Sequence, residues 1–237
     1  MIGKVETLLN LLKKSVRRTL GLNKNEHANY CFGQEGEDLI LLRIFPAEYK
    51  GFYIDIGAHH PQRFSNTYLL YRRGWKGINI DATPGCMDLF NTVRPNDTNL
   101  EIGISNVDEM REFHIFEESA LNTFNAKVAE ENIHYGCSRK NTIMIKTQRL
   151  SSILAHYLPP TTTIDLLTID VEGLDHVVLQ SLDFTKYRPR VIVCELLSND
   201  LEMAMKSTTA LILTENGYQL YSKLYHSCIW VRKDMVL

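Results

Sequence analysis

Short apolar runs alternate with helix-like segments along most of the chain. The apolar runs, rich in isoleucine, valine and leucine, cover residues 52–56, 77–81, 99–104, 164–170 and 191–195. Helical patterns lie between and after them at 67–73, 84–93, 150–157, 174–182 and 200–216, and Pro84 suits the first turn of its helix. Alternation of this kind predicts βα units and a mainly parallel sheet.

Three further segments complete the predicted domain. Residues 34–45 predict a helix with an acidic first turn. Residues 218–233 predict two strands near the last helix, antiparallel to one another. Residues 107–141 are weakly patterned, and we expect them to form a polar insertion over one edge of the sheet. The chain therefore predicts an α/β domain with one insertion.

Residues 1–22 carry a separate pattern. Apolar residues recur there at helical spacing, and Lys13, Lys14, Arg17 and Arg18 lie largely elsewhere, which predicts a basic amphipathic helix. Such helices dock most often on their own domain, and otherwise on a partner or an anionic membrane surface. We assign residues 1–29 to this helix and a polar linker, and 30–237 to the main domain.

Composition and charge narrow the class of protein. With 237 residues, 44% hydrophobic and 23% charged, the chain is long enough for one sizeable core. Its net charge of -2 and pI near 6.4 give no general polyanion-binding field, so we do not expect nucleic acid as a partner.

Cysteine spacing and hydropathy indicate where the protein resides. Its five cysteines are far apart and include no CxxC pair, as in reduced cytoplasmic proteins. No run of about 18 apolar residues is present, and the N-terminus lacks an uninterrupted apolar signal core. We expect a cytoplasmic protein, peripheral to the inner face of the membrane if residues 1–22 bind lipid; the oligomeric state is left open.

Acids mark the ends of the predicted strands, where a doubly wound sheet binds its ligands. Asp55, Asp81, Asp170 and Glu195 end four of the five apolar runs. Gly57 permits a close turn past a ligand, and Asp81, 26 residues after Asp55, is placed to accept from ribose hydroxyls. Because the first turn lacks a full GxGxxG, a dinucleotide and an NAD-dependent oxidoreductase are disfavoured. These features predict an adenosine-containing cofactor.

Several motifs in order resemble one known family. They are QEGEDLIL, DIGAHHPQRFSNTY, GWKGINIDATPG, LEIGIS, ALNTF, IDLLTIDVEGLDHVVLQSLDF and PRVIVCE. Over about residues 30–198 the chain resembles the FkbM family of S-adenosylmethionine-dependent methyltransferases. The resemblance implies a class I methyltransferase (Rossmann-like) fold, with a seven-stranded sheet, helices on both faces and an antiparallel last strand.

The resemblance also implies residues around S-adenosylmethionine: the loop after the first strand, the acid that holds the ribose, the segment beside the adenine, and an upstream motif at the methionine end. By this resemblance, the loop after the first strand has Asp55, Gly57 and Ala58, and the acid that holds the ribose is Asp81, followed by Ala82. Ile104 and Ser105 lie in the segment beside the adenine, and Gln34 and Glu37 lie in the upstream motif. The loop departs from the family pattern, because many members have an asparagine and a second glycine where this chain has His59, His60 and Pro61.

Methyl transfer to a hydroxyl needs a base or a divalent metal to ease loss of the proton. Asp170 and Glu195 could share an ion such as Mg²⁺, with Glu172 as a third ligand or as the base. His59 or His60 is the alternative base. In the simpler interpretations the two strand-end acids cap loops or hold the donor amine, and the histidines only form hydrogen bonds.

Three residues outside these strand ends are candidates for acceptor contacts. Asn122 lies in ALNTF and either faces the acceptor or forms a turn. Arg63 and Arg139 could meet an anionic part of the acceptor, although solvated surface arginines are more common.

We therefore expect an O-methyltransferase that acts on a hydroxyl of a sugar, sugar nucleotide or glycan precursor. The alternatives are an O-methyltransferase of a polyketide-type natural product, and a non-catalytic methyltransferase-like module that docks on a membrane or a glycan-synthesis partner.

Overall fold

The computed structural model describes residues 28–235. The helix predicted over residues 1–22 lies outside this range. Every element described below belongs to one compact unit, Cys31–Leu237.

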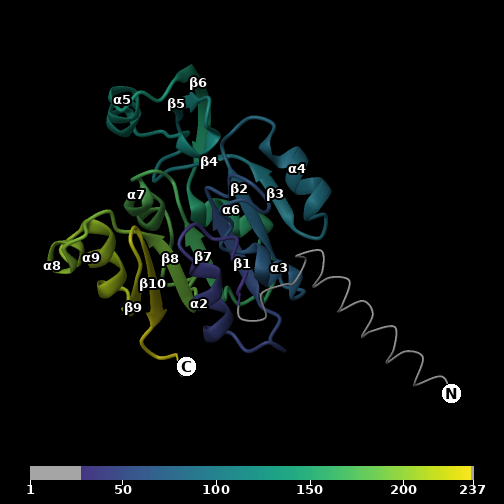
Figure 1. Cartoon of the computed structure of the whole chain (residues 1–237). Coiled ribbons are helices and arrows are strands. Elements are labelled where there is room, and N and C mark those ends of the chain that lie inside the picture. The colour runs from purple at the N-terminus through teal and green to yellow at the C-terminus, as the bar shows by residue number, and fades with distance from the viewer. Residues whose placement is uncertain (1–27, 236–237) are drawn as a thin grey trace, which may run out of the picture. The chain divides into compact units, whose positions relative to one another are not determined.

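A seven-stranded sheet forms the centre of this unit, in the order β3-β2-β1-β7-β8-β10-β9 (Figure 1). Neighbours from β3 to β8 are parallel, and β10 is antiparallel to both β8 and β9. The predicted sheet with its antiparallel last strand is therefore confirmed. The strands are β1 (Phe52–Ile56), β2 (Lys76–Asp81), β3 (Thr98–Glu101), β7 (Leu166–Ile169), β8 (Val191–Glu195), β9 (Tyr218–Lys223) and β10 (Ser227–Arg232).

Helices cover both faces of the sheet (Figure 1), because alternate strand residues are apolar on both sides. In β8, Ile192 and Cys194 join the cluster under one set of helices, while Val191 and Val193 join the cluster under the other. The first set is α6 (Leu150–Tyr157), α7 (Asp175–Gln180) and α9 (Thr208–Glu215), and the second is α2 (Glu37–Ile44) and α3 (Tyr68–Arg72).

Two further properties concern the described part of the chain. All five cysteines, which lie within residues 28–235, are free thiols. Among the described helices none is long and apolar enough to cross a bilayer.

Two predicted elements are each divided in the structure. The run 99–104 gives β3 and the short strand β4 (Gly103–Ile104), because the Ile102 N–H donates to the Asp81 carbonyl and β4 then pairs with another sheet. The segment 200–216 gives α8 (Leu201–Ala204) and α9, because the Ser207 side chain accepts from the Ala210 N–H and starts a new helix.

The position expected for Pro84 is wrong. Helix α4 (Cys86–Val93) begins after Gly85, whose φ of 77° is left-handed, so the proline lies before the helix and not in its first turn.

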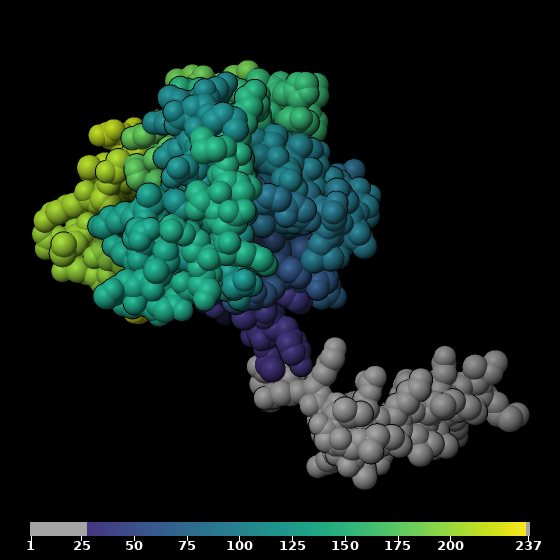
Figure 2. Space-filling model, turned by 90° about the horizontal axis from the view of Figure 1, so that it is seen from above, coloured from purple at the N-terminus to yellow at the C-terminus, as the bar shows by residue number. Residues whose placement is uncertain are grey.

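Residues 107–141 fold more regularly than the sequence pattern suggests. They contain β5 (Met110–Phe116), the 3₁₀ turn η1 (Ser119–Leu121) and α5 (Ala126–His134), and they lead into β6 (Arg139–Gln148). A second sheet, β4-β6-β5, holds this insertion together. Figure 2 shows residues of the insertion, in teal to green, spread over the face of the molecule seen from above.

A buried arginine ties the loops on one side of the sheet together. Arg94 is 0% exposed, and its guanidinium donates to the Pro61 carbonyl, Ser65 Oγ and Thr67 Oγ1, the last two at 2.7 Å. The Thr67 hydroxyl in turn donates to Asp55 at 2.6 Å. The positive charge therefore offsets a buried carboxylate and fixes the loop that follows β1.

Replacement of this arginine tests the network. We expect Arg94→Met to lower the free energy of unfolding by about 3 kcal/mol or more, because several buried hydrogen-bond acceptors and a buried acid lose their partner. Arg72→Met, at an exposed position, is the matched control and should change stability by less than about 0.5 kcal/mol. Urea denaturation measures both; similar losses for the two variants would contradict the structural role.

Candidate functional site

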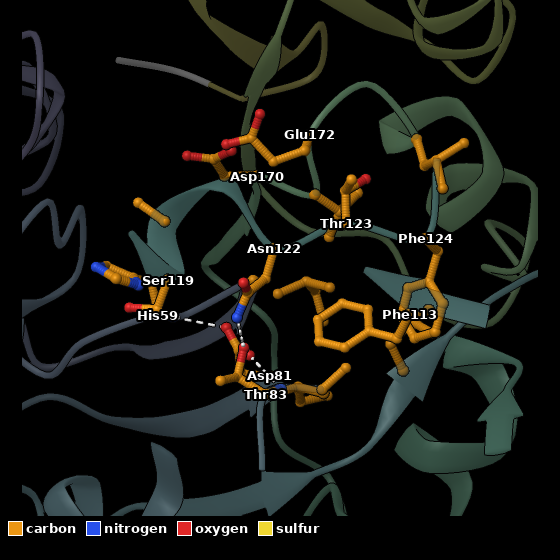
Figure 3. A pocket seen from close by; sticks show the side chains of 18 of the residues that line it. His59, Asp81, Thr83, Phe113, Ser119, Asn122, Thr123, Phe124, Asp170 and Glu172 are labelled. Atoms are coloured by element: carbon orange, nitrogen blue, oxygen red, sulfur yellow. Dashed lines mark hydrogen bonds between the residues drawn. The ribbon is translucent and has the colours of Figure 1, made fainter. Parts of the chain in front are cut away.

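A pocket lies at the carboxyl ends of β1, β2 and β7, beneath the insertion. It contains about 820 Å³ of space, open solvent at its mouth included. Figure 3 shows Asp81 and Thr83 on one side, Asp170 and Glu172 on another, and Phe113 and Phe124 on a third. The predicted residues that line it are Gln34, Gly57, His59, Asp81, Ala82, Ile104, Asn122, Asp170 and Glu172.

Gly57 is required by the approach of two strand ends. Its φ is 76°, and a Cβ atom added there would lie 1.7 Å from the Asp170 carbonyl oxygen. The Asp170 N–H donates to the Ile56 carbonyl at 3.0 Å, so the two backbones are joined at this point. Only glycine fits, and the result is that the loop after β1 and the acid after β7 face the same pocket.

His59 and Asp81 shape the loop after β1. The His59 N–H donates to Asp81 Oδ2 at 2.8 Å, and the Thr83 N–H donates to Asp81 Oδ1 at 2.7 Å (Figure 3). His59 has a φ of 51°, a conformation that asparagine and histidine adopt more readily than most residues, so it can replace the family's asparagine. Its Nε2 atom is buried without a partner, and burial lowers the pKa of the ring.

An aromatic wall closes one side of the pocket. Phe113 comes from β5 and Phe124 from the segment before α5, with ring centroids 4.6 Å apart, and Ile102 and Ile104 lie beside them. Asn122 accepts from the Phe116 N–H and donates to Thr83 Oγ1 at 3.0 Å, so it joins the insertion to the loop after β2. An apolar wall of this kind can hold a purine ring.

Acidic side chains gather on another side of the pocket. Burial, with the charge of Asp170, raises the pKa of Glu172 to about 8. Asp170 is open to the solvent of the pocket, yet enclosure by protein and the neighbouring charges of Asp55 and Glu37 raise its pKa to about 6. Glu172 has a left-handed φ of 54°, an uncommon conformation for a glutamate that turns the chain between β7 and α7. Because its pKa is raised to about 8, the carboxyl of Glu172 can change protonation near neutral pH.

Asp175 is a residue of this site that the sequence analysis missed. It is 2% exposed, and its carboxylate accepts from the Val171 N–H at 3.3 Å and the Glu195 N–H at 2.7 Å. It therefore joins the carboxyl ends of β7 and β8. The signal in the sequence was weak, because an acid at the start of a predicted helix is ordinary in itself.

Other predicted residues do not line the main pocket. Asp55 and Ser105 are buried, with Thr67 donating to the first and Arg111 to the second, and Ala58 packs against Met87 and Phe90. His60 Nδ1 accepts from the N–H groups of residues 62 and 63, which is a turn-forming role.

Glu37 and Glu195 line a smaller neighbouring cavity together with Gln34 and Asp170. The roles that the resemblance implies for these residues stay predictions.

Both arginines considered for an anionic acceptor are paired with acids. Arg63 donates to both carboxylate oxygens of Glu118 at 2.9 and 3.0 Å, and Arg139 donates to Glu130 at 3.0 Å. Neither lines the pocket. The Arg63 pair links the loop after β1 to the insertion.

Comparison with known proteins identifies the family. The family model described as "Methyltransferase FkbM domain" matches residues 55–220. The chain belongs to the FkbM methyltransferase family. The match begins at Asp55 and includes the strand-end acids Asp81, Asp170 and Glu195, so the resemblance inferred from the motifs is confirmed.

Several solved structures are similar to this chain at low identity. One is an FkbM methyltransferase from Methylobacillus flagellatus, with 10% identity, a TM-score of 0.43, and 77% of this chain and 43% of that chain covered. A second is a precorrin-6y C5,15-methyltransferase from Geobacter metallireducens, with 10% identity, a TM-score of 0.43, and 82% of this chain and 88% of that chain covered. A third is a TehB-like S-adenosylmethionine-dependent methyltransferase from Corynebacterium glutamicum, with 11% identity, a TM-score of 0.43, and 93% of this chain and 97% of that chain covered. The chain spans less than half the length of the first. No curated protein matches it.

The pocket of this FkbM domain suits the donor that the family implies, S-adenosylmethionine. A carboxylate oxygen has about two lone pairs, and each Asp81 oxygen uses one for a backbone N–H, so each retains one for a ribose hydroxyl. The aromatic wall suits the adenine, and the buried Nε2 of His59 has no partner within the described structure.

The predicted metal site lacks a full ligand set. Among residues 28–235, no group of three or more His, Cys, Asp and Glu side chains is arranged to hold a metal ion. Within this part of the chain, Asp170 and Glu195 thus have no third partner among these side chains for a shared ion.

Three buried or half-buried acids make stability depend on pH. Burial raises the pKa of Glu172 to about 8, Asp175 to about 7 and Glu195 to about 10, so the folded state holds these protons more tightly than the unfolded state. The stability that these protonated acids contribute is complete below pH about 4, and it is lost as the pH rises through about 7 to 10. We expect the free energy of unfolding to fall from pH 6 to pH 9 in urea titrations.

Glu195→Gln, which keeps the shape of the neutral acid, should flatten this fall. Glu48→Gln, at an exposed site, should leave it unchanged. An equal slope in the wild type and in Glu195→Gln would show that the carboxyl is not held neutral in the folded state.

Proposed function

We propose that the chain is an O-methyltransferase that moves the methyl group of S-adenosylmethionine to a hydroxyl of a sugar or glycan precursor. One observation carries the proposal: a single pocket joins an apolar aromatic wall and Asp81 at one side to Asp170 and Glu172 at another. A donor nucleoside and a hydroxyl-bearing acceptor can therefore lie in one cavity. Family membership supports the reaction class.

The donor side of the pocket is formed by four groups. Asp81 would accept from the ribose hydroxyls, Phe113 and Phe124 would pack on the adenine, and Gln34 would lie toward the methionine end. When bound, S-adenosylmethionine supplies an electrophilic methyl group on a positively charged sulfur. The rigid backbone contacts of Asp81 hold its carboxylate before the donor arrives, which lowers the cost of ordering the site.

Glu172 is the base that the site supports best. Its carboxylate lines the pocket, and a pKa raised to about 8 makes it a stronger base than an ordinary glutamate once it is ionised. Asp170 beside it can accept a second hydroxyl of the acceptor and so orient the reacting one. His59, from the other side of the pocket, is the alternative base, and burial keeps its ring neutral at pH 7.

Removal of the ribose acid tests donor binding. We expect Asp81→Ala to weaken S-adenosylmethionine by about tenfold to a hundredfold, because two hydrogen bonds to a charged group are lost. Asp88→Ala, at an exposed position of α4, should bind as the wild type does. Calorimetric titration measures both, with NAD as a control ligand. If the wild-type chain does not bind S-adenosylmethionine, a non-catalytic module becomes the better interpretation.

Replacement of the two candidate bases tests the chemistry. We expect Glu172→Gln to lower kcat by about 10²- to 10⁴-fold with donor affinity unchanged, and His59→Gln to lower it far less. The wild-type rate should rise with pH through about 8, because Glu172 must be ionised to act as the base. Release of S-adenosylhomocysteine over a panel of sugars measures both effects; a larger loss for His59→Gln would transfer the role of base to the histidine.

A further inference from the structure

Phe64, in the loop after β1, lines the main pocket in an uncommon backbone conformation. Its φ is 56°, in the left-handed region, where a bulky residue is strained and glycine fits at lower cost. The residue is large and apolar, yet it is 41% exposed. Strained conformations of this kind persist where the surrounding structure fixes them, and they gather at sites that bind ligands.

Two arginines fix the backbone and the ring of Phe64. Buried Arg94 donates to groups on both sides of it and so holds residues 61–67. The guanidinium carbon of Arg63 lies 4.4 Å from the centroid of the ring, and Arg63 is itself held by two hydrogen bonds to Glu118 of the insertion. The orientation of the ring is therefore set before any ligand binds.

The ring belongs to the part of the pocket that contains Asp170. Both residues line the main pocket, and both also line the smaller neighbouring cavity. The proposed adenine wall is formed instead by Phe113 and Phe124 of the insertion, which lie on a different side of the pocket from Asp170 and Glu172 (Figure 3). Phe64 is thus a second apolar surface, available to the ligand whose hydroxyls the two acids would meet.

A sugar in its pyranose form needs two kinds of contact. Its hydroxyls project from the edge of the ring and form hydrogen bonds, whereas the C–H groups on its faces are apolar. Carboxyl groups can bind the hydroxyls, and an aromatic ring can remove a C–H face from water. Phe64 provides the aromatic surface, and Asp170 and Glu172 provide the carboxyl groups, in one pocket.

We propose that Phe64 is a specificity-determining residue on which the acceptor sugar packs through an apolar face, with its reacting hydroxyl at Glu172. The inference rests on the proposed function and narrows its acceptor class to sugars in the ring form, in preference to open-chain polyols. The competing role for the ring is a contact with the donor, which has methylene groups of its own.

Ring-form and open-chain acceptors test the proposal. Methyl transfer by the full chain is measured as release of S-adenosylhomocysteine, with methyl pyranosides of neutral hexoses and 6-deoxyhexoses and with the corresponding open-chain alditols. We expect kcat/KM for at least one pyranoside to exceed that for its alditol by about tenfold or more, because only the ring form has a rigid apolar face to bury.

Variants of Phe64 locate the effect. Leucine has a similar backbone cost at this φ and lacks the aromatic ring, whereas tyrosine retains it. We expect Phe64→Leu to raise KM for the pyranoside by about tenfold, with kcat and the affinity for S-adenosylhomocysteine nearly unchanged. Phe64→Tyr should keep KM within about twofold of the wild type. Tyr221→Leu, at a 47% exposed position on β9, should change none of these values.

The possible outcomes separate this inference from the proposed function. Equal kcat/KM for ring and open-chain forms in the wild type overturns the inference, whether or not the variants fold. A wild-type KM in folded Phe64→Leu overturns it too, and so does weaker binding of S-adenosylhomocysteine, which would assign the ring to the donor. A wild-type chain that does not bind S-adenosylhomocysteine, or transfers no methyl group to any sugar, fails at the proposed function instead.

Discussion

The close packing of Gly57 against the Asp170 carbonyl is the constraint on which the site depends. Any side chain at Gly57 would push the ends of β1 and β7 apart, since its first carbon would overlap the carbonyl oxygen. With glycine there, the loop after β1 turns back to the end of β2 and donates to Asp81 from His59. Asp81 and the two acids Asp170 and Glu172 are therefore positioned by one backbone contact.

Two buried groups hold this contact from opposite directions. Arg94 fixes residues 61–67 by donating to a carbonyl and two hydroxyls, so the loop after β1 cannot relax away from the sheet. Asp175 fixes the other side by accepting from N–H groups at the ends of β7 and β8. Each satisfies polar groups that would be costly to bury alone, and together they give the pocket a rigid floor.

Sequence pattern predicts this fold well because its central strands are continuous apolar runs that end in acids. The run that ends at Asp81 fixed both the strand and the edge at which a ligand lies. The insertion was harder, because Phe113 and Phe124 come from a segment with little periodicity and meet only through the pairing of β5 with β6. Asp55 was difficult for a different reason. Its position in the motif suggests a contact with the cofactor, whereas its carboxylate accepts a hydrogen bond from Thr67. Side-chain direction at a strand end depends on neighbours that a single sequence does not identify.

The gathering of acids at one end of the pocket is unfavourable for folding and useful for the proposed reaction. Burial, with the charge of Asp170, raises the pKa values of Glu172, Asp175 and Glu195, so the protein retains these groups at some cost in stability. A neutral carboxyl both donates and accepts hydrogen bonds, which suits an acceptor rich in hydroxyls. An ionised one attracts a positively charged sulfur and repels a phosphate. The same set of acids can therefore both favour the donor and bind an uncharged sugar, and no arginine or lysine is among the described residues that line the pocket.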